Sequence, residues 1–116
     1  MVSENNDKLF KLAIEVICNP VNKKYVSIAT LWEAAIKFDI GKLKLSSGFE
    51  GFIKTIDDNG FIFLNINSDH IKSIIGLPYI HRDPFDRIII AQAITENMLV
   101  VTSDTNISKY EIKTIW

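Results

Sequence analysis

The segment from Asp83 to Asp104, DPFDRIIIAQAITENMLVVTSD, contains a strong helix signal followed at once by a strand signal. Asp83 before Pro84 is typical of a helix start, because aspartate accepts hydrogen bonds from the first turn and proline lacks the N–H that would stay unpaired. The helix is expected to continue to about Asn97, and apolar residues on most of its faces predict that it is buried. Met98–Thr102 is a continuous apolar run, as expected for a parallel strand covered on both faces.

The rest of the chain alternates helix and strand signals in the same way. Apolar residues at helical spacing predict helices, and short β-rich runs predict strands. The expected elements are a helix at 7–18, a strand at 25–29, a helix at 30–40, a helix at 48–58, a strand at 61–66, a short helix at 68–75, a turn or short helix at 106–110 and a strand at 113–116. This alternation predicts an α/β fold with a mostly parallel sheet. With 116 residues, the chain is expected to form a single domain, 1–116.

Composition excludes several classes of protein. Hydrophobic residues make up 47% and the net charge is only -1, so the chain is too apolar and too balanced to be disordered. Its single cysteine, Cys18, excludes a disulfide scaffold. No apolar run approaches the ~20 residues of a membrane span. Met1–Asp7 lacks the basic flank and apolar stretch of a signal peptide, so we expect a cytoplasmic location and no membrane partner.

Three acidic residues lie where a parallel sheet binds its ligands, outside the carboxyl ends of the strands. Glu33 follows the strand expected at 25–29, Asp86 lies in the first turn of the helix at 83–97, and Asp104 follows the strand at 98–102. If the three carboxylates converge, their mutual repulsion must be relieved by protonation or by a cation. Oxygen ligands of this kind suit magnesium or manganese rather than zinc.

Each acid also has a purely structural interpretation. Glu33 stands three residues after Thr30, as in a capping box. Asp86 is favoured electrostatically near a helix N-terminus, and Asp104 is able to close a turn before Asn106. For any one acid taken alone the structural interpretation is the stronger one, whereas the three together favour a site.

The other chemistry-bearing side chains show no second site. His70 and His81 are far apart in the sequence and have no local partner, which argues against zinc. Cys18 falls on an apolar helical face, where packing is expected. Trp32 and Trp116 are expected in the core rather than as platforms for base stacking.

Three motifs of the chain resemble those of PIN-domain proteins, and they occur in the family's order. They are VSIATLWEAAIK at 26–37 with Gly41–Leu43, HRDPFDR at 81–87 with Ile90–Ala93, and LVVTSD at 99–104. Within the family, the chain most resembles the VapC-type toxins of bacterial toxin–antitoxin pairs.

The resemblance implies a three-layer α/β/α, PIN-like fold and RNA cleavage with magnesium or manganese. By resemblance, Glu33, Asp86 and Asp104 are the catalytic, metal-binding carboxylates, while Asp83 is expected to act first as a helix cap. The implied partners are an RNA substrate and a cognate antitoxin protein. Lys37 and Arg87 are expected to contact RNA phosphates, because they lie beside the acids in the sequence.

One departure from the family leaves two functions open. Family members begin with a hydrophobic strand that ends in an aspartate, and Met1–Asp7 contains no such apolar run. We therefore expect this strand and its metal ligand to be missing, and we expect a homodimer because unpaired sheet edges favour association. The first function is a VapC-type, metal-dependent endoribonuclease, inactive if the missing ligand is essential. The alternative is a non-catalytic PIN-like interaction module that binds an antitoxin or self-associates.

Overall fold

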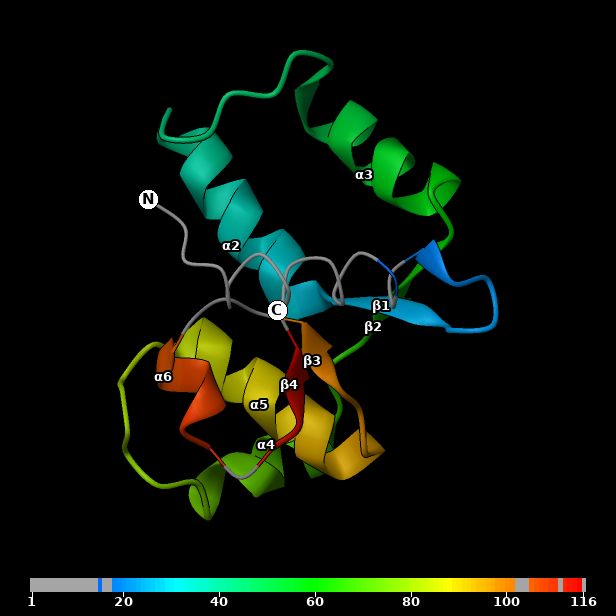
Figure 1. Cartoon of the computed structure of the whole chain (residues 1–116). Coiled ribbons are helices and arrows are strands. Elements are labelled where there is room, and N and C mark those ends of the chain that lie inside the picture. Colours follow the sequence, from blue (N-terminus) through cyan, green and yellow to red (C-terminus); the bar gives the residue numbers. More distant parts are fainter. Residues whose placement is uncertain (1–14, 16–17, 102–104, 111, 116) are drawn as a thin grey trace, which may run out of the picture. The chain divides into compact units, whose positions relative to one another are not determined.

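The structure is a computed structural model in which residues 15, 18–101, 105–110 and 112–115 are described (Figure 1). These residues fall into two compact units. One spans Lys23–Ile66, and the other, the α5 unit, contains the described residues from Asn67 onward and those before Lys23. Helices and strands alternate in the chain, which confirms the predicted α/β class.

The Lys23–Ile66 unit contains a parallel pair of strands. Its elements are β1 (Lys24–Ser27), α2 (Ile28–Asp39), α3 (Gly48–Asp58) and β2 (Phe61–Leu64). β1 pairs with β2 so that Lys24 lies opposite Phe61 and Ser27 lies opposite Leu64. Parallel strands require a crossover connection, and α2 and α3 provide it here. The predicted parallel pairing is therefore confirmed in this unit.

Helix α2 begins earlier than the sequence analysis predicted. The Ser27 side chain accepts a hydrogen bond from the Ala29 N–H at 3.0 Å and caps the helix, which starts at Ile28. Because Ser27 is the N-cap, Thr30 and Glu33 lie inside the helix. The predicted capping box between these two residues is therefore wrong.

The α5 unit carries the second parallel pair. Its elements are α4 (Ser68–Ile75), α5 (Pro84–Glu96), β3 (Val100–Val101), α6 (Thr105–Ser108) and β4 (Thr114–Ile115). Val100 lies opposite Thr114, and Val101 lies opposite Ile115. The predicted strands at 98–102 and 113–116 thus exist, and their described parts begin at Val100 and Thr114.

Helix α5 is buried, as its apolar sequence predicted. Ile88, Ile90, Ala91 and Ala93 are all buried, and Ile90 is fully enclosed with 0% of its surface exposed. Asn97 ends the helix in the left-handed conformation, with φ of 53°, which asparagine adopts more readily than most residues. The burial of this helix makes it the core element of its unit.

Helix α4 packs against α5 and is joined to it by polar contacts. Its capping box is reciprocal: Asn67 accepts from the His70 N–H, and the Nδ1 atom of His70 accepts from the Asn67 N–H, both at 3.1 Å. The opposite ring nitrogen, Nε2, therefore carries the proton and donates to Glu96 Oε1 at 2.8 Å. Ser73 Oγ and Thr95 Oγ1 lie 2.8 Å apart. These contacts fix α4 along the second half of α5.

Several predictions from the sequence are corrected or lie outside the described residues. Trp32 is 59% exposed instead of lying in the core, and Trp116 lies outside the described part of the chain. Most of the helix predicted at 7–18 also lies outside it, and Cys18, predicted to pack, is exposed. Among the described residues, none of the helices has both the length and the apolarity that crossing a membrane requires.

The burial of α5 predicts a large difference between two isoleucines of one helix. Ile90→Ala should lower the free energy of unfolding by about 2–5 kcal/mol, because it leaves a cavity at a fully buried position. Ile94→Ala is the matched control, since Ile94 is 45% exposed and its truncation should cost clearly less. Urea unfolding of both variants measures the difference. Equal losses would contradict the position of α5 in the core.

Candidate functional site

The candidate site is built around the N-terminus of α5. Asp83 Oδ1 accepts hydrogen bonds from the Phe85 N–H at 2.9 Å and from the Asp86 N–H at 3.2 Å. The aspartate thus satisfies two of the N–H groups that a helix start leaves without an intrahelical partner. The prediction that Asp83 is a helix cap is confirmed.

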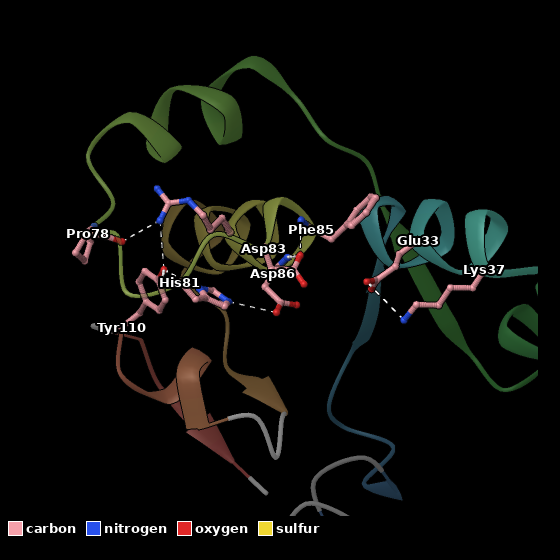
Figure 2. A network of polar contacts seen from close by, with 9 residues as sticks. Glu33, Lys37, Pro78, His81, Asp83, Phe85, Asp86 and Tyr110 are labelled. Atoms are coloured by element: carbon pink, nitrogen blue, oxygen red, sulfur yellow. Dashed lines mark hydrogen bonds and ion pairs between the residues drawn. The ribbon is translucent and has the colours of Figure 1, made fainter. Parts of the chain in front are cut away.

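Asp86 lies in the first turn of the same helix and contacts a histidine. Its Oδ2 atom lies 3.3 Å from His81 Nε2, and its side chain is 22% exposed (Figure 2). A negative charge at this end of α5 is favoured by the helix dipole. Asp86 is therefore a part-exposed carboxylate whose orientation is influenced by a neighbouring ring.

The hydroxyl of Tyr110 connects His81 to Arg87. It lies 3.4 Å from the His81 backbone N–H, 2.9 Å from His81 Nδ1 and 3.3 Å from Arg87 Nη1. A phenol has two acceptor positions and one proton. The backbone N–H and the guanidinium are donors only, so they take the acceptor positions, and the hydroxyl proton is directed at Nδ1. If the His81 ring is neutral, this arrangement leaves Nε2 as the nitrogen that bears the hydrogen facing Asp86 Oδ2.

Arg87 points into the protein. It is 6% exposed, and its Nη1 atom donates to Pro78 O at 2.9 Å while Nη2 donates to Leu77 O at 3.5 Å. Its guanidinium also lies over the Tyr79 ring, 4.4 Å from the centroid. A buried guanidinium with these partners does not present its charge to a phosphate. The structure therefore replaces the expected phosphate contact of Arg87 with a structural one.

Glu33 and Lys37 form an ion pair on α2, in the Lys23–Ile66 unit. The distance from Lys37 Nζ to Glu33 Oε2 is 3.7 Å, and the side chains are 55% and 31% exposed respectively. The residues are four positions apart and so share one face of the helix. Both charged groups are accessible to solvent.

The described residues do not test whether the three predicted carboxylates converge. Asp86 belongs to the α5 unit, Glu33 belongs to the Lys23–Ile66 unit, and Asp104 lies outside the described residues. Within the described part of the chain, no group of three or more histidine, cysteine, aspartate or glutamate residues is placed to hold a metal ion. The convergence of the three acids remains a prediction.

The donor chemistry of Asp86 nevertheless fits a hard divalent cation. A part-exposed carboxylate offers oxygen ligands, which magnesium and manganese prefer. Carboxylates that bind metals are usually held in turn by hydrogen bonds from neighbouring groups. His81 supplies such a contact to Asp86.

His81 and Tyr110 are the site residues that sequence reasoning missed. The contact between them spans 29 positions, whereas His81 and Asp86 are five positions apart. The only local signal was the position of His81 just before the Asp83 cap. The contact of His70 with Glu96 spans 26 positions and was missed for the same reason.

Comparison with known proteins identifies one family. The profile of the PIN domain matches residues 2–113, which is nearly the whole chain. No curated protein and no solved structure matches it.

The geometry at the start of α5 predicts different effects for two substitutions of Asp83. Asp83→Ala should lower the free energy of unfolding by about 1 kcal/mol, because two N–H groups lose their acceptor. Asp83→Asn keeps an acceptor oxygen and should cost clearly less. Chemical denaturation of both variants compares them. An alanine variant as stable as the unmodified chain would show that the cap contributes nothing.

Proposed function

The chain belongs to the PIN domain family, and from this premise we propose that it is a metal-dependent endoribonuclease of the VapC toxin type. PIN domains are generally divalent-metal-dependent nucleases. The observation that carries the proposal is the match over residues 2–113, which includes the acidic start of α5. The VapC assignment is supported by the HRDPFDR and LVVTSD motifs.

In this proposal, three carboxylates hold magnesium or manganese: Glu33, Asp86 and Asp104. The bound ion would activate water and stabilise the negative charge that develops on the phosphate. Asp86 contributes an oxygen from the start of α5, held by His81. Glu33 contributes from α2, where Lys37 is its present partner.

Lys37 is the proposed phosphate contact. Its ammonium group is exposed and lies beside an acidic residue, so a nucleic acid phosphate is able to reach it. Arg87 is left out of this role because its guanidinium is buried among backbone carbonyls. Its part in the proposal is structural, through Tyr110 and His81.

The partners follow from the same assignment. We propose an RNA substrate, a cognate antitoxin protein, a homodimer and a cytoplasmic location. Support comes from the resemblance of the motifs to VapC-type toxins.

A non-catalytic interaction module is the second candidate. Such a module would bind an antitoxin or a second copy of the chain without cleaving RNA. A cleavage assay separates it from the nuclease.

Substitution of Asp86 tests the nuclease proposal directly. The purified chain should cleave labelled RNA with manganese or magnesium, and excess chelator should stop the reaction. Asp86→Asn should reduce the rate by more than about 100-fold, because losing a ligand costs more than losing a group that only supports one.

The control for this experiment is Asp58→Asn. Asp58 is an exposed carboxylate on α3, paired with Lys54 at 2.9 Å, and its substitution should leave the rate unchanged. A chain that binds its metal and cleaves no RNA would instead favour the interaction module. Cleavage that persists in Asp86→Asn would remove Asp86 from the proposed machinery.

A second prediction concerns the phosphate contact. Lys37→Gln should weaken RNA binding to a similar extent for all sequences and should reduce the log–log salt slope by about 0.7, the value for one contact to a single strand. Lys54→Gln is a matched control, because Lys54 is also exposed and also forms an i,i+4 ion pair. Titrations at several salt concentrations measure both slopes. The same slope for Lys37→Gln and the unmodified chain would exclude the contact.

A further inference from the structure

We propose that His81 is a positioning residue for Asp86, and that its proton is fixed on Nε2 by the hydroxyl of Tyr110. The inference rests on the proposed function in one respect, the assignment of Asp86 as a ligand of the divalent cation. It adds a residue that lies outside the three carboxylates. Figure 2 shows the relevant side chains at the start of α5.

The first step is the direction of the hydrogen bonds around Tyr110. The Arg87 guanidinium and the His81 backbone N–H both lie within 3.4 Å of the hydroxyl oxygen and are able only to donate. The hydroxyl therefore donates its proton to His81 Nδ1, 2.9 Å away. In the neutral ring Nδ1 is then the acceptor, and Nε2 bears the hydrogen that faces Asp86 Oδ2 at 3.3 Å.

The second step is the rigidity of the support. Tyr110 is 4% exposed, and Arg87 is anchored to Pro78 O, so neither group swings freely in solvent. Tyr110 follows α6, His81 precedes α5, and Arg87 belongs to α5 itself. Three separate segments of the α5 unit thus determine where the His81 ring lies.

The third step is the consequence for a bound ion. A carboxylate that is already oriented loses less conformational freedom when it binds a cation. Groups that hold a metal ligand in this way typically contribute 10–100-fold to metal affinity or activity. Removal of the His81 donor should therefore weaken manganese binding by at least about tenfold, although His81 itself is not a ligand in this proposal.

The experiment titrates manganese into the full 116-residue chain and into variants of it, with melting temperatures recorded for each. His81→Ala should bind at least about tenfold more weakly. His81→Gln, whose amide N–H is able to replace the Nε2 donor, should stay within about threefold of the unmodified chain. His81→Asn places its amide near the Nδ1 position and should behave like alanine. If His81→Ala does not fold, the comparison of His81→Asn with His81→Gln still tests the inference.

Two further measurements separate positioning from general stability. Glu96→Gln weakens another histidine–carboxylate contact on the same helix, that of His70, and should leave manganese affinity unchanged. In an Asp86→Asn background, His81→Ala should have little additional effect, because the two residues act through one contact. Nitrogen NMR of the unmodified chain should show His81 with its proton on Nε2, and Tyr110→Phe should reduce the population of that form.

Several outcomes would overturn the inference. They are unchanged affinity in His81→Ala, equal losses in the alanine and glutamine variants, a proton found on Nδ1, or no manganese binding by the unmodified chain. The proposed function fails separately. If the chain binds manganese with the expected His81 effects but cleaves no RNA, the nuclease proposal is refuted and the positioning role is supported. If the chain cleaves RNA and His81→Ala does not change the cleavage, the nuclease proposal is supported and the positioning role is refuted.

Discussion

The constraint on which the α5 unit depends is the burial of an arginine. A guanidinium removed from water requires partners for its N–H groups, and an unpaired one would be strongly destabilising. Arg87 finds them in Leu77 O, Pro78 O and the Tyr110 hydroxyl, and its guanidinium carbon lies over the Tyr79 ring. The segment between α4 and α5 must therefore pass close to α5, and the turn after α6 must bring Tyr110 to the same place. The position of His81 follows from these two requirements.

Arg87 and Asp86 differ in burial because adjacent side chains on a helix point in different directions. Neighbouring positions on an α-helix point about 100° apart, so one turn is able to send Arg87 inward while Asp86 remains 22% exposed. The buried residue organises the surroundings, and the part-exposed one is available for chemistry. His81 links the two through Tyr110, which couples the core of the unit to its candidate ligand.

Much of the fold could be predicted because its signals are local. The Asp83–Pro84 cap, the apolar run of α5 and the bounds of α3 and α4 all follow from residues within a few positions of one another. The start of α2 was misplaced because Ser27 and Thr30 are both good caps, and only the backbone decides between them. The inward direction of Arg87 depends on residues 9 to 23 positions away, and the contact of His81 with Tyr110 spans 29 positions. Such contacts leave no periodic pattern in the sequence. Arg87, a basic residue next to Asp86, was therefore interpreted as a phosphate contact.

The two carboxylates that the structure describes differ in how firmly their partners are held. The pair of Glu33 and Lys37 is solvent-exposed and four positions apart, an arrangement worth only about 0.3–0.5 kcal/mol. A divalent cation at Glu33 would therefore displace Lys37 at little cost and release its ammonium group for a phosphate. The contact between His81 and Asp86 is less exposed and is supported by a buried tyrosine and a buried arginine, so it is suited to persist when the carboxylate binds an ion. In the proposed metal site, the same chemical pairing, a carboxylate with a nitrogen donor, would thus be a releasable contact on α2 and a lasting support on α5.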